Sequence, residues 1–404
     1  MINRSYILFF AILLGVGTGL WHQEYLLKAA DTISSLFISF LQLLASPIVF
    51  LSILSTLLGM RGVDEMRLLG KKVFAYTLVT TILATLVALS LFLIIDPLSA
   101  FTQTGTIDSP IHEGSYFSFL MKIIPSNFCK AFLENNVIGI AFIAVVLGLA
   151  ALKLPEENKA PLCLFFSSLF KLILKTTEFA ILFMPIAVWA FMSLLIAELQ
   201  QNSSQFRGLS FYLMTVLGAN LIQGIIILPL LLKLKKLSPL KLSKGCFKAL
   251  VTAFFSKSSN ATLPLTLQCA ENQLKIKSKI AHFSLPLCTV INMNGCAAFI
   301  LTTVLFVAGV NGISFSALDY GLFVLFATLA AIGNAGVPMG CFFLSSAFLI
   351  SMGVPIKLMG LILPFYTFID MVETTLNVWS DVCVTAIVDK EIAAEAITEL
   401  SPQS

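Results

Sequence analysis

Charged residues are scarce in this chain. They make up 11% of its 404 residues, whereas hydrophobic residues make up 58%. Soluble proteins average about 25% charged residues, so this composition excludes a water-soluble globule. The stretches 73–95, 209–232 and 288–314 contain no charged residue, and each is long enough to cross the hydrocarbon core of a bilayer as a helix. The sequence therefore predicts an all-α, polytopic membrane protein.

Histidine is also scarce, and cysteine lacks any ordered spacing. The three histidines, His22, His112 and His282, are scattered along the chain. The eight cysteines have no metal-type spacing, and most lie in apolar segments, so we expect small buried hydrophobic side chains rather than disulfides or a zinc site. Lys257 beside Ser258 could be the Ser/Lys pair of a membrane-embedded hydrolase, but no histidine supports such a reaction. We predict no enzyme and no cofactor.

Basic residues gather in two connections and are missing from a third, 98–115. By the positive-inside rule, the two basic connections lie in the cytoplasm and 98–115 lies outside. We therefore expect a multi-pass protein of the plasma (inner) membrane with both termini in the cytoplasm. A lipid or nucleic-acid patch is the alternative for the lysine cluster, but we expect no nucleic-acid partner. The basic residues are Arg61, Arg67, Lys71 and Lys72 in one connection and Lys233, Lys235, Lys236, Lys241, Lys244 and Lys248 in the other.

The first part of the chain reads as ordinary membrane spans. The first span has no small-x-small cleavage pattern after it, so we interpret it as a helix rather than a signal peptide. The fifth is expected to be long and broken, because Lys171, Lys175 and Glu178 interrupt it before Pro185. The predicted spans are 5–21, 32–58, 72–95, 133–153, 162–197 and 209–232.

Beyond residue 240 the segments become short and interrupted. "SNATLP" at 259–264 and "GNAGVP" at 333–338 resemble each other, and each precedes a helix with a polar middle, "NMNG" at 292–295 and "FIDMVETTLNVWSD" at 368–381. We interpret this as an internal repeat of a hairpin followed by an interrupted helix; two proline kinks in ordinary helices are the alternative. Irregular backbone survives at membrane depth only where protein or a water-filled cavity surrounds it. Paired broken segments of this kind indicate the midplane binding site of a transporter, and helix N-termini at the tips would favour an anionic group.

The last of these stretches carries a polar stripe. Helical spacing places Asp370, Glu373, Thr374, Asn377 and Asp381 on one face. Each ionised carboxylate at the bilayer centre costs at least about 2.5–3.5 kcal/mol, so these three need partners or protons. Bound cations and a zwitterionic substrate would supply partners; a structural network, for example with Lys257, is the alternative.

At these motifs the chain resembles the dicarboxylate/amino acid:cation symporter family, which includes the glutamate transporter homologues and is also called the sodium:dicarboxylate symporter family. The matching stretches are "SKSSNATLPLTL", "SLPLCTVINMNG", "IGNAGVPMG" and "DMVETTLNVWSDVCVTAIV". The resemblance implies eight transmembrane helices and two re-entrant helical hairpins in inverted repeats, a homotrimer and an elevator mechanism. It also implies three regions. Residues 1–240 would form mainly trimerisation scaffold helices, with the third and sixth helices moving with the transport domain. Residues 241–390 would form the core transport domain with both hairpins and the last two helices, and residues 391–404 a cytoplasmic tail.

The resemblance also implies roles for individual residues. Asp370 would receive the substrate's α-ammonium group, and Asn377 would bind its α-carboxylate beside a sodium site. Asp381 would bind sodium, with Asn292 and Asn377 supplying neutral oxygens. The remaining substrate-binding positions are Ser258 and Ser259 at the first hairpin, Val337 at the tip of the second, Thr374, and Cys296, which replaces a threonine near the substrate.

Several positions depart from the family pattern. Members that take dicarboxylates carry Arg where this chain has Glu373, and an ionised Glu repels a substrate carboxylate. We therefore predict a symporter for a neutral or cationic amino acid. Glutamate, aspartate or dicarboxylate transport is the alternative, and an ion channel is a distant one.

The cation-binding positions differ too. Asn294 replaces an aspartate, which leaves Thr77, Thr80, Thr81 and Asn294 as weaker, neutral sodium ligands. Near a second sodium site, Val290 and Asn334 replace threonines. Only the site around Asp381 keeps its charged ligand, so we predict fewer coupled sodium ions, with Glu373 as a proton carrier. The coupling ion is thus Na⁺, H⁺ or both.

Overall fold

The computed structural model describes residues 4–58, 64–101, 125–133, 137–201, 203–334 and 339–400. These residues form helices and no strands, as the sequence predicts. The first half contains α1 (Arg4–Trp21), α2 (Glu24–Leu58), α3 (Asp64–Ile95), α5 (Phe128–Leu133), α6 (Val137–Ala151), α7 (Glu156–Gln201), α8 (Ser203–Ile222), the π-helix η1 (Gln223–Ile227) and α9 (Leu228–Leu234). The second half contains α10 (Pro239–Ser256), α11 (Ser259–Asn272), α12 (Ser278–Ile291), α13 (Asn294–Val310), α14 (Ala317–Ile332), α15 (Gly340–Ser351) and α16 (Lys357–Leu400).

The lengths and composition of the helices confirm an integral membrane protein. Within the described residues, four helical segments are long and apolar enough to span a bilayer: Leu69–Ile95, Arg207–Leu234, Ser278–Val310 and Lys357–Ala393. Large apolar side chains face outward on several helices; on α1, for example, Phe9 and Phe10 are each 61% exposed. Lipid tails would cover such side chains without cost.

The fifth predicted span is not broken, contrary to our expectation. α7 continues without interruption from Glu156 to Gln201, with Pro161 and Pro185 inside it. A proline removes one backbone hydrogen bond and does not force a helix to end when its neighbours hold it. Lys171 and Lys175 are exposed, one helical turn apart, and therefore leave the apolar face of α7 intact.

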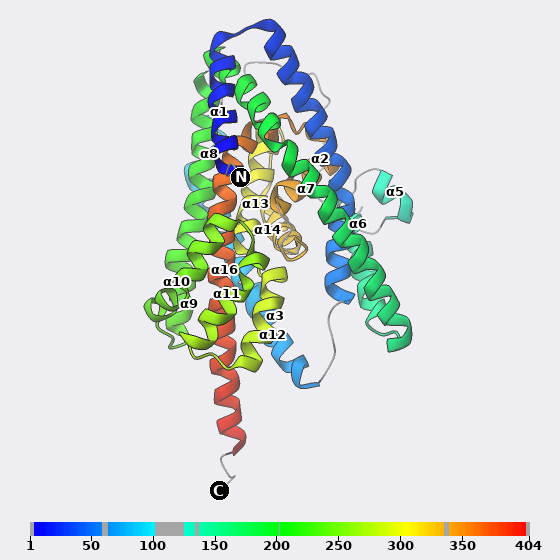
Figure 1. Ribbon diagram of the computed structural model, residues 1–404, viewed down its shortest axis with the longest axis vertical. Coiled ribbons are helices and arrows are strands. Elements are labelled where there is room, and N and C mark those ends of the chain that lie inside the picture. Colours follow the sequence, from blue (N-terminus) through cyan, green and yellow to red (C-terminus); the bar gives the residue numbers. More distant parts are fainter. Residues whose placement is uncertain are drawn as a thin grey trace.

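The helices fall into two groups, the second of which has a buried helix at its centre (Figure 1). In the first, α7 packs lengthwise on α1 and α2, and α6 packs on α2. In the second, α13 is the central helix and is covered by α3, α8, α14, α15 and α16. Within the Ser278–Val310 segment, α13 is almost entirely buried inside the protein. Polar groups on α13 are therefore shielded from both lipid and water.

A π-turn interrupts the α8–α9 span where Pro229 follows. In π-helical register the carbonyl of Gly224 would accept from residue 229, which is proline and has no N–H. The indole Nε1–H of Trp379 on α16 donates to that carbonyl instead, at 3.0 Å. This bond ties η1 to α16 and places Gln223 inside the protein.

Both basic clusters meet one acidic residue near the end of α16. Glu391 accepts hydrogen bonds from Lys72 Nζ at 3.2 Å and from Lys235 Nζ at 2.7 Å. The Tyr76 hydroxyl also donates to Glu391. The start of α3 and the connection after α9 therefore lie at the same end of the molecule as the C-terminal part of α16 (Figure 1).

Candidate functional site

Of the two helices that we expected to be interrupted, the first is interrupted and the second is not. The stretch 368–381 lies inside α16, which runs without a break from Lys357 to Leu400, because the stretch contains no glycine or proline that would end a helix. α12 ends at Ile291, and Asn292 (φ −100°, ψ 69°) and Met293 (φ −105°, ψ 64°) are non-helical before α13 begins. Gly295 follows directly and lies against α16. A Cβ atom at this position would lie 2.7 Å from the Cα of Glu373. The glycine therefore allows the start of α13 to approach the polar stripe of α16 closely.

Asp381 lies in a buried network of polar side chains. Its side chain is 1% exposed, and its Oδ1 accepts a hydrogen bond from Asn292 Nδ2 at 2.9 Å. The same Nδ2 donates to Ser380 Oγ at 3.0 Å, and Asn294 Nδ2 donates to that hydroxyl at 2.6 Å. Hydroxyl, amide and carboxylate oxygens are hard donors of the kind that alkali and alkaline-earth cations prefer.

The weaker predicted sodium ligands divide into two kinds. Thr80 Oγ1 donates to Asn292 Oδ1 at 3.1 Å, and Asn294 Nδ2 donates to the same oxygen at 3.0 Å, so both join the network. Thr81 Oγ1 instead bonds to the carbonyl of Thr77 within its own helix. The structure thus brings Thr80 and Asn294 to Asp381 through Asn292.

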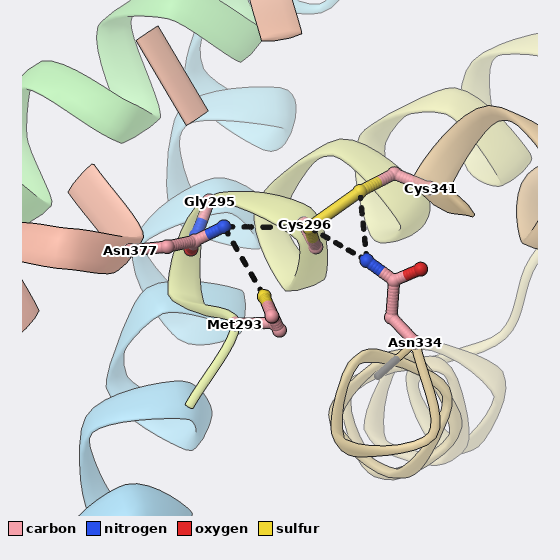
Figure 2. Close-up of a disulfide and its surroundings, with 6 residues drawn as sticks. All are labelled: Met293, Gly295, Cys296, Asn334, Cys341 and Asn377. Atoms are coloured by element: carbon pink, nitrogen blue, oxygen red, sulfur yellow. Dashed lines mark hydrogen bonds between the residues drawn. A yellow bond between two sulfur atoms is a disulfide. The ribbon is translucent and has the colours of Figure 1, made fainter. Parts of the chain in front are cut away.

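Asn377 lies beside a different set of atoms. Its Oδ1 accepts the backbone N–H of Gly295 at 2.8 Å, while its Nδ2 donates to Met293 Sδ at 3.4 Å and Cys296 Sγ at 3.5 Å. Although Asn377 and Asp381 are one turn apart on α16, their side chains therefore take part in separate groups of hydrogen bonds. Figure 2 shows the Asn377 amide pointing at the sulfur atoms.

The other two carboxylates of the stripe have different surroundings. Asp370 is partly buried, hydrogen-bonds to Thr374 and interacts electrostatically with Lys257. Glu373 is 1% exposed, and neither of its carboxylate oxygens has a hydrogen-bond partner among the residues that the structure describes. The Lys257 interaction is thus with Asp370, whereas the Glu373 carboxylate faces the interior and has no hydrogen-bond partner in the described ranges.

The first break joins α10 and α11 at Lys257 and Ser258. Lys257 takes a left-handed conformation (φ 53°) and ends α10. Ser258 caps α11, its hydroxyl accepting the N–H of Ala261 at 3.2 Å. Ser259 begins α11 and is buried. The helix N-terminus at this break leaves backbone N–H groups free to bind an acceptor.

The second break lies between α14 and α15, and it brings together two cysteines. Cys296 at the start of α13 and Cys341 at the start of α15 form a disulfide, with their Cα atoms 5.3 Å apart (Figure 2). Our expectation that no cysteine forms a disulfide is therefore wrong. The two residues are 45 positions apart, so only the packing of α15 on α13 reveals that they are neighbours. Val337, the predicted tip residue, lies outside the described residues.

Asn334 lies on the other side of the two sulfur atoms. Its Nδ2 donates to Cys296 Sγ at 3.2 Å and to Cys341 Sγ at 3.6 Å. Figure 2 shows this amide and that of Asn377 approaching the sulfur atoms from different segments, the turn after α14 and helix α16. The sulfur atoms therefore lie directly beside the residues predicted to hold an amino acid.

Sequence reasoning missed three residues of the site. Gln223 Nε2 donates to Thr80 O at 3.0 Å and to Asn294 Oδ1 at 3.2 Å. Its position as an amide inside an apolar span was a usable signal. Ser380 lies three residues after Asn377 and seven after Glu373, so helical spacing places it at the edge of the same face and was a usable signal. Cys341 gave no signal, because nothing in its sequence context relates it to Cys296.

Comparison with known proteins gives a family match along nearly the whole chain. The sequence pattern of the sodium:dicarboxylate symporter family matches residues 5–391. The chain is similar to neutral amino acid transporter B(0) of Rattus norvegicus, at 26% identity over 398 residues that cover 86% of this chain and 71% of the relative. It is also similar to excitatory amino acid transporter 3 of Mus musculus, at 33% identity over 257 residues that cover 63% of this chain and 49% of the relative. An excitatory amino acid transporter of Caenorhabditis elegans is 31% identical over 247 residues, 61% of this chain and 49% of that protein. The aligned chain thus spans about half the length of the excitatory relatives.

Proposed function

The chain belongs to the sodium:dicarboxylate symporter family, which is a family of transporters and not of enzymes, and we propose that it imports an amino acid together with a cation. The relatives support an amino acid as the substrate, since they are named as neutral and excitatory amino acid transporters. The observation that carries the proposal is that two helix breaks, at 257–258 and at 292–293, lie against the same face of α16. Irregular backbone at membrane depth is tolerated where it lines a binding cavity.

Sodium is the coupling ion that the buried network around Asp381 supports. Asp381 supplies a carboxylate, and Asn292, Asn294, Thr80 and Ser380 supply neutral oxygens around it. Asn377, which faces the sulfur atoms instead, is better placed to hold the α-carboxylate of the amino acid. Asp370 is the proposed partner for its α-ammonium group, with Thr374, Ser258, Ser259 and Val337 as further contacts.

Glu373 supports a substrate without an acidic side chain. An ionised Glu373 would repel a substrate carboxylate, whereas an ammonium or guanidinium group would give its two unpartnered oxygens a hydrogen-bonding partner. A cationic amino acid therefore fits this position best, and a neutral one fits if Glu373 carries a proton. A proton held there would make H⁺ a second coupling ion.

The arrangement of helices supports the architecture of the family. We propose that α10 with α11, and α14 with α15, are two re-entrant hairpins, and that they move with α3, α8, α12, α13 and α16 as a transport domain of the elevator type. The packing of α3, α8, α14, α15 and α16 around α13, and of α10, α11 and α12 on α16, supports such a domain. α1, α2, α6 and α7 would then be scaffold helices of a homotrimer in the plasma membrane, with both basic connections in the cytoplasm.

Uptake by the purified protein in proteoliposomes tests these proposals. Labelled lysine or arginine should accumulate when a sodium gradient is imposed, and unlabelled lysine, arginine, serine or alanine should compete better than aspartate or glutamate. Stronger competition by the acidic amino acids would refute the substrate class. Uptake that is unchanged when sodium is replaced at fixed pH would refute sodium coupling. Efflux of ions with no saturable uptake would favour a channel instead.

A further inference from the structure

Three potential metal ligands meet beside the proposed amino-acid site. The Sγ atoms of Cys296 and Cys341 and a carboxylate oxygen of Glu373 all lie within 4.8 Å of one another, and all three residues are buried. They come from three helices, α13, α15 and α16. Ligands of one tetrahedral zinc ion lie about 3.6–3.8 Å apart, given Zn–S and Zn–O bonds of about 2.3 and 2.1 Å. Small rotations of these side chains would bring them to that spacing.

Two independent features around these atoms favour a cation. First, the Glu373 carboxylate is 1% exposed and has no hydrogen-bond partner within the described part of the chain, so a negative charge there lacks compensation. Secondly, Asn334 Nδ2 donates to both sulfur atoms, and Asn377 Nδ2 donates to that of Cys296. Amide N–H donors around sulfur stabilise thiolates and typically support metal–thiolate centres from the second coordination shell.

We propose that Cys296, Cys341 and Glu373 bind one thiophilic divalent cation, of the Zn²⁺ or Cd²⁺ class, when the disulfide is reduced. In the reduction, a thiolate of a dithiol attacks one sulfur atom and the Cys296–Cys341 S–S bond breaks. Two electrons and two protons pass from the dithiol to Cys296 and Cys341, and the dithiol leaves as its own disulfide. The cation then displaces both thiol protons and is held by two thiolates and the carboxylate, with a fourth position open. The disulfide form has no thiolate and does not bind the ion.

This site differs from the one proposed for sodium. The network around Asp381 offers oxygen atoms, whereas the new site offers two sulfur atoms, which select softer metals. A bound ion would also tie the starts of α13 and α15 together and occupy the carboxylate that a cationic substrate would use. The inference rests on the contacts of these residues and does not require that the protein transports amino acids.

Cadmium titration of the purified full-length protein in detergent tests the site. The protein is first reduced with a phosphine, which is then removed, and the ultraviolet sulfur-to-cadmium charge-transfer band is followed. We expect saturation at one ion per chain, loss of that band in Cys296→Ser and Cys341→Ser, and no band in the unreduced protein. Asn334→Ala, which removes the side-chain amide that donates to both sulfur atoms, should weaken binding by about 10- to 100-fold.

Matched variants separate the metal site from the disulfide and from other thiols. Glu373→Gln keeps both cysteines, so this variant should still form the disulfide but should bind cadmium more weakly once reduced. Glu373→Asp keeps a carboxylate and should therefore bind cadmium more tightly than Glu373→Gln does. Cys269→Ser removes a buried free thiol of α11 and should leave the titration unchanged. Equal binding by oxidised and reduced protein would overturn the proposal, as would a band that survives in both cysteine variants or an unaltered affinity in Glu373→Gln. The readout is the cadmium band, so absence of amino-acid uptake would bear on the proposed function alone.

Discussion

Asn292 on the α12–α13 break donates a hydrogen bond across 2.9 Å to the carboxylate of Asp381 on α16. This bond links the two polar segments that the sequence places 89 residues apart, and both side chains are fully buried. A buried carboxylate held by a single amide has capacity for a cation.

Asp381→Asn should abolish stabilisation by sodium. A ligand at a hundredfold excess over its Kd stabilises the folded state by about 2.7 kcal/mol, and removal of the charged ligand should eliminate that gain. The measurement is the shift in Tm on replacing choline chloride with sodium chloride at constant ionic strength. Asp31→Asn, at an exposed position of α2, is the control and should keep the full shift. An undiminished sodium shift in Asp381→Asn would place the ion elsewhere.

Glu373→Arg should change the substrate class. A guanidinium group at this position can bind a substrate side-chain carboxylate by two charge-assisted hydrogen bonds, each worth about 1.5–3 kcal/mol. Aspartate and glutamate should then compete for uptake in proteoliposomes, and lysine and arginine should lose their effect. Glu373→Gln removes the charge without adding a new one, so it should weaken cationic substrates without admitting acidic ones. If Glu373→Arg and the parent protein prefer the same amino acids, Glu373 does not face the substrate side chain.

Gly295→Ala should destabilise the protein through overpacking. The new methyl group would lie 2.7 Å from the Cα and 2.9 Å from the carbonyl oxygen of Glu373, and both are backbone atoms that cannot rotate away. The expected loss is about 1–3 kcal/mol, seen as a lower Tm of the detergent-solubilised protein.

Gly321 in α14 provides the matched control, because a Cβ atom there meets nothing within 4 Å. Gly321→Ala should leave stability unchanged or raise it, since alanine favours a helix interior by about 1 kcal/mol. Equal Tm values for the two variants would show that α13 and α16 are less closely packed than the structure indicates.

Glu391→Gln should weaken the anchoring of α16 to the two basic connections. It removes the charge that pairs with Lys72 and Lys235, and its side chain is 26% exposed. Because water screens part of the interaction, we expect a loss of about 1 kcal/mol, reduced further at high salt. Glu24→Gln is the control: Glu24 pairs with Lys28 at 2.7 Å, but the two side chains are 77% and 71% exposed. Its Tm should not change measurably, and an equal effect of both substitutions would contradict the anchoring.

The sequence alone determined the membrane location, the helical class and the family. These properties depend on composition, on the length of uncharged runs and on motifs of adjacent residues, which are all local. The break at 292–293 was predicted for the same reason, since it follows from a short polar sequence inside apolar ones, and the break at 257–258 lies directly before the interruption predicted at 259–264. The spacing of Asp370, Glu373, Asn377 and Asp381 likewise fixed their common face, because helical periodicity relates positions one turn apart.

The tertiary structure decided which of these residues face one another. Asn377 and Asp381 share a face of α16, yet one faces the sulfur atoms and the other faces Asn292, because different parts of the α12–α13 segment lie opposite each turn. The Cys296–Cys341 disulfide, and the burial of Glu373 without a hydrogen-bond partner among the residues that the structure describes, follow from the packing of α15 and α16 on α13. Contacts between distant segments depend on how helices pack, and no local pattern of residues encodes that packing.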